Sequence, residues 1–183
     1  MVEYITKAEM RGFAFSQSAG EQEAFKRAAR TRSPVGATFL SHSSKDDELV
    51  AGAITILRNH GALVYIDSKD PTMPPTTSHI TASKLKERIQ QSGRFVLLAT
   101  ENSRESKWVP WELGAADGFK GVPNIAIFPA VESRSDFAWT KWEYMGLYRR
   151  IVWGRHKDYQ KDIWMVLDHH NNTATELRRW LTR

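Results

Sequence analysis

One glutamate of the sequence stands where it could take part in chemistry. Glu112 follows Trp108 by four residues within the stretch SKWVPWELG, residues 106–114. Residues four apart share one face of a helix, so the indole and the carboxylate should be neighbours. This pair suits a ligand with a flat ring and a hydroxylated sugar, because the ring stacks and the sugar hydroxyls donate to the carboxylate. Glu112 also lies near a predicted helix N-terminus, where the helix dipole should keep it ionised at neutral pH.

Polar residues also follow three short apolar runs, VGATFLS, ALVYI and RFVLLAT. Each run reads as a buried strand, and the carboxyl ends of parallel strands meet at one edge of a sheet, where ligands bind. We therefore expect these polar residues to gather at one edge together with Glu112. They are Ser41, His42, Ser43 and Asp46, then Asp67, then Glu101, Asn102 and Ser103.

Strands that alternate with helices must position these residues. Apolar runs predict strands, and apolar residues at helical spacing predict helices. The predicted strands are 35–41, 62–66, 94–100, 124–130 and 147–153. The predicted helices are 46–61, ended by Gly61; 80–93, with Ile80, Leu85 and Ile89 inward; 108–118; and 173–183, capped by Thr173 or Thr175.

The order of these elements predicts an α/β fold. Uniformly apolar strands separated by helices indicate a parallel sheet that helices cover on both faces. At this length we expect a flavodoxin-like, doubly wound, mainly parallel five-stranded sheet. Residues 67–79 are expected to form a loop with three prolines, and residues 101–106 a turn.

The first 33 residues read as a separate extension. QEAFKRAARTR, residues 22–32, is rich in good helix formers, and SPVG then marks a break. We predict a helical N-terminal extension over 1–33 and a main domain over 34–183 that includes a C-terminal helical elaboration.

Composition narrows the classes of function. The 183 residues include no cysteine, which excludes disulfides, a thiolate zinc site and a cysteine nucleophile. Only two of the six histidines are adjacent, and neighbours on one chain rarely chelate one metal well, so no metal site is expected. The net charge of +5 is scattered, which argues against nucleic acid as a partner. No apolar run suits a membrane span or a signal peptide, so we expect a cytoplasmic protein.

Common nucleotide and hydrolase motifs are missing from the sequence. It has no G-x-G-x-x-G after a strand and no G-x-x-x-x-G-K-[ST] phosphate loop. It also has no G-x-S-x-G elbow and no H-E-x-x-H.

Four motifs follow one another over residues 35–130: FLSHSSKDD before a helix, VYID before a long loop, FVLLAT, and S-x-W-x-x-x-E. In this order they resemble the motifs of a Toll/interleukin-1 receptor (TIR) domain of the stand-alone bacterial kind. Two positions depart from the family pattern: TMPPTTSHI lacks the usual loop glycine, and Val109 stands in place of a cysteine. The resemblance implies that Glu112 is catalytic, that Trp108 is the accompanying tryptophan, that Ser41, His42 and Ser43 line a nucleotide pocket, and that Asp67 opens the BB loop.

The family resemblance also implies an activity. TIR enzymes cleave the bond between nicotinamide and ribose in NAD, which is a substrate here and not a cofactor; no cofactor is expected. The cationic nicotinamide leaves as a neutral molecule without a general acid, so one carboxylate at Glu112 suffices. Water attack gives ADP-ribose, and internal attack gives a cyclic product. The resemblance further implies a role in anti-phage defence. It also implies self-association through TIR–TIR contacts and a downstream effector that senses the product.

Other interpretations stay open from the residues. The chain could be a non-enzymatic TIR scaffold that self-associates, although many such scaffolds lack the glutamate. It could also be a nucleoside deoxyribosyltransferase-like enzyme, which shares the architecture and a catalytic carboxylate. A receiver domain is disfavoured, because Ser41 and His42 replace the acidic pair after the first strand. Individually, Glu112 could be a solvated helix residue, Asp67 a turn cap, and His42 a structural residue.

Overall fold

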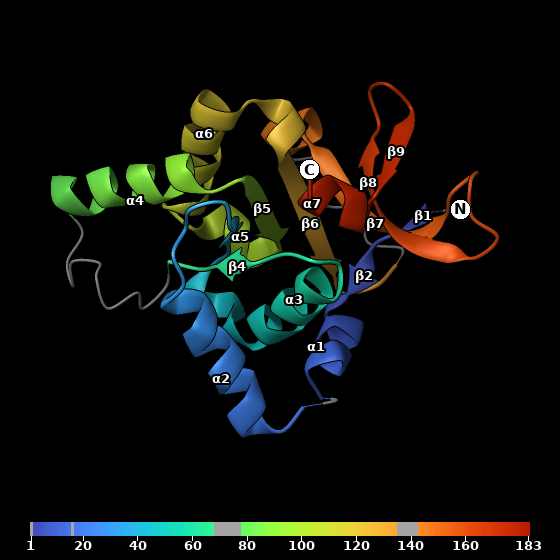
Figure 1. The fold of residues 1–183 in the computed structure, drawn as a ribbon, viewed down its shortest axis with the longest axis horizontal. Helices are drawn as coiled ribbons and strands as arrows, with labels where there is room; N and C mark the ends of the chain where they lie inside the picture. Colours follow the sequence, from blue (N-terminus) through green and yellow to red (C-terminus); the bar gives the residue numbers. More distant parts are fainter. Residues whose placement is uncertain (1, 16, 68–77, 135–142) are drawn as a thin grey trace.

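Five parallel strands form the centre of the molecule. The computed structural model describes residues 2–15, 17–67, 78–134 and 143–183. The strands lie in the order β4 (Val64–Tyr65), β3 (Thr38–Ser41), β5 (Arg94–Ala99), β6 (Ile125–Val131) and β7 (Arg149–Arg155) (Figure 1). All four neighbouring pairs are parallel. In chain order this is 2-1-3-4-5, the flavodoxin-like arrangement, and it confirms the predicted fold class.

Four further strands join this sheet at or beyond β6 and β7. β8 (Asp162–Asp168) pairs antiparallel with β7, and β9 (Thr173–Glu176) pairs antiparallel with β8. From the other end of the chain, β1 (Val2–Glu3) pairs with β7 and β2 (Ile5–Thr6) pairs with β6. These strands are absent from the sequence-based prediction; β1, β2 and β9 have only two to four residues, which carry almost no periodicity, whereas β8 has seven.

The predicted closing helix over 173–183 is wrong in its first turn. Thr173 and Thr175 lie in β9 and do not cap a helix; α7 begins at Leu177 and ends at Leu181. The run TATE alternates β-branched threonines with other residues, a composition that strands favour, and β8 offers it a pairing edge. The C-terminal region therefore consists of strands as well as one short helix.

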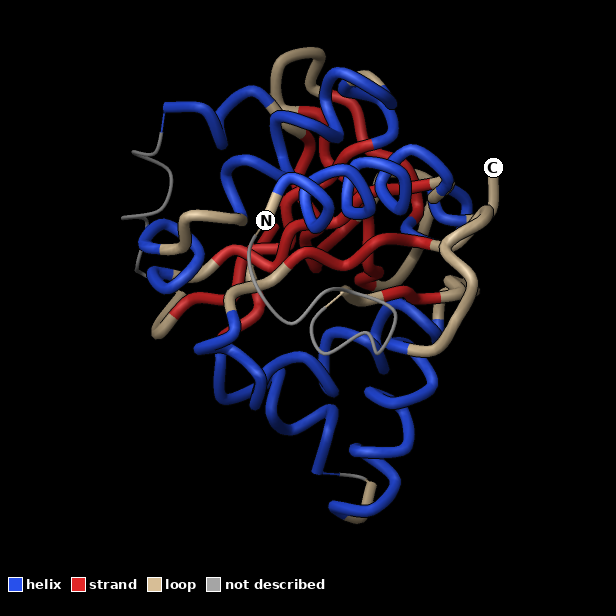
Figure 2. The backbone as a smooth tube through the Cα atoms, turned by 90° about the vertical axis from the view of Figure 1, so that its left-hand side faces the viewer, coloured by secondary structure: helices blue, strands red, loops and turns tan. Residues whose placement is uncertain are grey.

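Helices cover both faces of the sheet (Figure 2). Their bounds are α1 Lys7–Phe15, α2 Ala19–Arg30, α3 Asp47–Asn59, α4 His79–Gln91, α5 Glu101–Glu105 and α6 Val109–Lys120, with 3-10 turns at Ser44–Asp46, Val122–Asn124 and Glu143–Leu147. The predicted helices 46–61, 80–93 and 108–118 are thus confirmed, while the predicted turn at 101–106 is a short helix. Within the described ranges, no helix is both long and apolar enough for a bilayer crossing.

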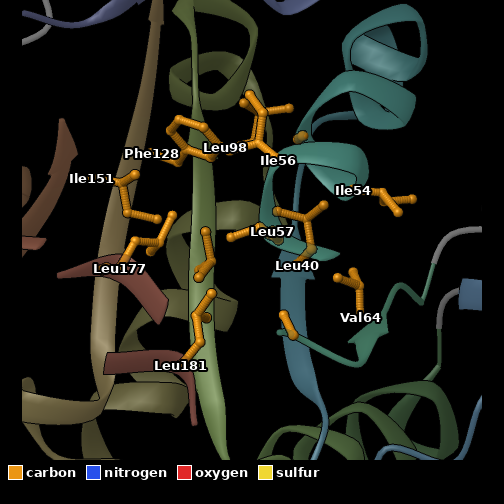
Figure 3. Close-up of a cluster of buried hydrophobic side chains, with 14 of the residues drawn as sticks. Leu40, Ile54, Ile56, Leu57, Val64, Leu98, Phe128, Ile151, Leu177 and Leu181 are labelled. Carbon is orange, nitrogen blue, oxygen red and sulfur yellow. The ribbon is translucent and has the colours of Figure 1, made fainter. Parts of the chain in front are cut away.

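Alternate residues of the strands supply two cores on opposite faces. Leu40, Leu98 and Phe128 pack with α1, α3 and α7 in one core (Figure 3). Phe39 and Phe95 pack with α4 and α6 in the other. The inward direction predicted for Leu85 and Ile89 of α4 is confirmed, but Ile80 in the first turn of that helix is 51% exposed. The period-2 alternation of a strand buried on both faces explains why each apolar run has no polar interruption.

The N-terminal segment packs on the main sheet. Its predicted helix 22–32 corresponds to α2, which a Ser18–Glu21 capping box begins. Before it, β1, β2 and α1 lie against β7, β6 and α3. The division of the chain at residue 33 stays a prediction, since the segment is helical in part and also contributes two strands.

Candidate active site

The glutamate singled out in the sequence is buried where a strand end meets a helix. Glu112 lies in the first turn of α6 and is 4% exposed. The hydroxyl of Ser41, the last residue of β3, donates to Glu112 Oε2 at 2.5 Å, across 71 residues of sequence. The Glu112 amide donates to the Trp108 carbonyl at 2.8 Å, which places these two residues one helical turn apart. The predicted gathering of Ser41 and Glu112 at one sheet edge is therefore observed.

The environment of Glu112 favours its protonated form. Burial raises the pKa of its carboxyl well above the ordinary 4.5, the negative charge of Asp67 raises it further, and the hydrogen bond from Ser41 opposes both. Burial and the charge of Asp67 therefore oppose the helix dipole, which was predicted to keep Glu112 ionised. A dipole at the first turn is worth a fraction of a kcal/mol up to about 2 kcal/mol, whereas complete burial of a carboxylate costs more.

Asp67 lies at the same edge, directly beyond β4. It is half-buried and close enough for its charge to act on Glu112. Two carboxyl groups therefore face one region, an arrangement that attracts a cationic ligand and disfavours ionisation of both groups without one. Residues 68–77, which include most of the predicted proline-containing loop, lie outside the described residues.

Trp108 forms an aromatic wall with Trp111 at the start of α6. Their ring centroids are 5.3 Å apart and the planes meet at 89°, an edge-to-face pair. Both rings are half-buried against the core that contains α4 and α6, and Lys86 lies over the Trp111 ring at 5.8 Å. The exposed part of the wall is available to a flat ring.

His42 and Ser43 continue the chain from Ser41 and are both buried. His42 Nδ1 lies 3.3 Å from the Leu40 carbonyl oxygen, and Ser43 Oγ accepts from the Lys45 amide at 3.3 Å. These contacts lie within their own loop, so they shape it. The role of both residues in binding a nucleotide stays a prediction.

Asp46, one of the polar residues expected at this edge, links two of its segments through bonds that the sequence does not indicate. It is 2% exposed, and its carboxylate accepts from Thr100 Oγ1 at 2.6 Å and from Asn102 Nδ2 at 2.7 Å. These bonds join the loop after β3 to the start of α5. Thr100 and Ser103 form a capping box that begins α5, with serine in place of the more usual glutamate. This spacing in the sequence is the signal that could have predicted the start of the helix.

A separate cavity of about 310 Å³ lies between the N-terminal strands and β7–β8. Tyr4, Phe13, Trp153 and Trp164 line it together with charged residues. Among the described residues, none that lines it belongs to the edge that carries Glu112. We place the candidate site at Glu112, because polar groups from separate strand ends converge there around a carboxyl with a perturbed pKa.

Known proteins are similar in sequence to this chain. A sequence model of the TIR domain family matches residues 38–160. A Bacillus cereus (strain MSX-D12) protein, named as a 3' cyclic ADP-D-ribose synthase, is 29% identical over 180 residues, which cover 96% of this chain and 91% of that protein. A Cytobacillus dafuensis protein, named as a cyclic ADP-D-ribose synthase, is 36% identical over 78 residues, which cover 41% of this chain and 21% of that protein.

Proposed function

The chain belongs to the TIR domain family, and from that premise we propose that it is an enzyme that cleaves NAD and forms a cyclic ADP-ribose signal in anti-phage defence. The names of the two relatives support this activity. The single observation that carries the proposal is the buried Glu112 carboxyl, which Ser41 holds at the carboxyl edge of the sheet beside Asp67 and a tryptophan wall.

The proposed reaction needs only one carboxylate. The bond between ribose C1′ and the nicotinamide nitrogen breaks, and its electron pair neutralises the cationic ring, so the leaving group requires no proton. The ribose then develops positive charge, which an ionised Glu112 stabilises in a site with little water. A hydroxyl oxygen of the ADP-ribose bonds to C1′ and loses its proton, which closes the cyclic product; attack by water would give linear ADP-ribose instead.

The raised pKa of Glu112 is consistent with a site whose ligand is a cation. Without substrate, burial and the charge of Asp67 favour the protonated carboxyl. A nicotinamide cation beside the two acids lowers the pKa of Glu112, because an opposite charge nearby favours the ionised form. In this proposal substrate binding itself generates the catalytic carboxylate, and Trp108 forms the wall against which a ring of NAD stacks.

Two further parts of the proposal rest on the family alone. They are self-association through TIR–TIR contacts and a downstream effector that senses the product. The cytoplasmic location expected from the sequence stays a prediction. Ser41, His42, Ser43 and Asp67 are proposed as substrate-binding residues, with Ser41 also orienting Glu112 through its hydrogen bond.

Product analysis tests the proposed class of reaction. Purified protein at high concentration is incubated with NAD, and in parallel with a pair of deoxynucleosides and free bases, and products are resolved by chromatography with mass detection. We expect nicotinamide from NAD together with a companion of mass equal to NAD minus nicotinamide, which contains no added water. Base exchange between deoxynucleosides with intact NAD would support the deoxyribosyltransferase alternative, and turnover of neither would support a scaffold.

A further inference from the structure

A buried lysine from the N-terminal segment lies among residues that follow the central strands. Lys7, the first residue of α1, is 8% exposed. Its Nζ is 2.7 Å from Glu101 Oε2 and 2.7 Å from Glu132 Oε1. Glu101 begins α5, two residues after β5, and Glu132 directly follows β6. Lys7 lies outside the stretch 38–160 that the family model matches, so the segment before that stretch supplies a charge to the site edge.

This lysine stays cationic in place. Burial alone would lower the pKa of Lys7, but hydrogen bonds and charges from Glu101 and Glu132 outweigh it and raise the pKa. Both carboxylates are more than half exposed, at 54% and 65% of their side chains. They can therefore return to water if the lysine is removed, so its loss does not leave a buried unpaired charge.

From Glu101 a continuous set of contacts leads to the proposed catalytic carboxyl. Thr100 and Asn102, the neighbours of Glu101, both bind the Asp46 carboxylate. Asp46 ends the short loop that leaves β3 at Ser41, and Ser41 donates to Glu112. The same α5 leads into α6 through Ser106, whose hydroxyl accepts from the Val109 amide at 3.3 Å. Five residues form too few backbone bonds to hold α5 by themselves, so side-chain anchors decide where it lies.

The helix that carries Lys7 is itself fixed. α1 crosses α3 at Gly52, where a Cβ would overlap the Met10 carbonyl, so the two backbones are in direct contact (Figure 1). Arg11 also pairs with Glu48 of α3 at 2.7 Å, but with 35% and 60% of the two side chains exposed this pair adds little to the hold of the backbone contact. The ammonium of Lys7 is therefore a fixed point against which α5 is held.

We propose that Lys7 is a positioning residue for the Glu112 site, which holds α5 and, through Asp46 and Ser41, the geometry of the catalytic carboxyl. The proposal rests on the proposed NAD-cleaving function for its catalytic readout. It assigns the N-terminal segment a part in the reaction: the segment completes the edge of the site without contacting substrate.

Lys7→Met tests the proposal, with Arg11→Met as the matched control on the same helix. Methionine keeps the apolar stem and removes the charge. We expect kcat for nicotinamide release to fall about tenfold or more in Lys7→Met with little change in KM, because misplacement of a reacting group costs rate and not binding. Arg11→Met should stay within about twofold of the wild type, although it also loses an ion pair of α1. Lys7→Arg, which can still pair with both carboxylates, should recover most of the rate.

Non-additivity gives a second readout that a merely structural role would not produce. Glu101→Gln should lower kcat as Lys7→Met does, and the double variant should be no worse than either single one. Equal losses in Lys7→Met and Arg11→Met, or full activity in Lys7→Met, would overturn the proposal.

Amide hydrogen exchange separates this inference from the proposed function. Exchange of residues 101–105 should be faster in Lys7→Met than in the wild type and in Arg11→Met, whether or not NAD is cleaved. Unchanged exchange there overturns the role of Lys7 even in an active enzyme. If exchange is faster in Lys7→Met but the wild type does not cleave NAD, the contact of Lys7 with α5 is supported. Only the proposed function is then contradicted.

Discussion

Replacement of Glu112 by glutamine should stabilise the folded protein increasingly as the pH rises above 4.5. Below pH 4.5 the replacement should not change how the free energy of unfolding depends on pH. At low pH the carboxyl is protonated in both the folded and the unfolded chain, so it contributes no pH dependence. As pH rises through the ordinary pKa of 4.5, the unfolded chain releases the proton first, because burial and Asp67 raise the pKa in the folded state. The free energy of unfolding of the wild type therefore falls in this window, and glutamine, which does not titrate, removes the fall.

The slope of this effect is fixed by linkage. The wild type should lose about 1.4 kcal/mol relative to Glu112→Gln for each pH unit between the two pKa values of the carboxyl. For a chain of this size that corresponds to a difference in Tm of roughly 3–5 °C per unit. Glutamine keeps an oxygen that accepts from the Ser41 hydroxyl, so the contact that Ser41 makes with Glu112 survives. Any cost of its extra amide group is independent of pH and shifts the whole curve without changing its slope.

Calorimetric or urea unfolding from pH 4 to 8, on wild type and variant in parallel, measures the difference. Glu105→Gln is the control, because the hydrogen bond from Lys45 and its positive charge lower the pKa of Glu105. That variant should not gain stability as pH rises. Parallel stability curves for wild type and Glu112→Gln would refute the account of a buried, protonated carboxyl.

Three further predictions follow from the same contacts. Asp67→Asn removes a negative charge that raises the pKa of Glu112, so the pH-dependent gain from Glu112→Gln should be smaller in that background, as the same unfolding series would show. Ser41→Ala removes the hydrogen bond that favours the ionised carboxyl; in steady-state assays with NAD, nicotinamide release should fall about tenfold or more and its rising pH limb should move to higher pH. Gly52→Ala places a methyl group against the Met10 carbonyl, so urea unfolding should show a loss of about 1–3 kcal/mol, and an unchanged midpoint would argue against the close α1–α3 crossing.

The central sheet was predictable because its signals are local. β3, β4 and β5 are short apolar runs, each with a helix after it, and the edge rule then places Ser41 beside Glu112 despite their separation in sequence. The strands at both ends of the chain were not predictable in this way. β1 and β2 have two residues each, and TATE becomes a strand only because β8 lies beside it.

The electrostatics of the site were not predictable from local rules either. The position of Glu112 in a first helical turn argues for an ionised carboxylate, but the state of the group depends on what packs over it and on the charge of Asp67 from another strand end. The bonds of Asp46 to Thr100 and Asn102 and those of Lys7 to two glutamates are long-range for the same reason. The types and spacing of residues in the sequence indicated the candidate site residues. Only the fold shows which of these residues are in contact.

Nicotinamide release from NAD by the wild type, Glu112→Gln and Glu105→Gln, at protein concentrations above that of NAD, tests the central claim most directly. Excess protein favours any self-association that activity requires and makes a single turnover visible by mass detection. The account predicts release by the wild type and Glu105→Gln, and a rate at least about a hundredfold lower in Glu112→Gln. Equal release by the wild type and Glu112→Gln, or none by the wild type, would contradict it.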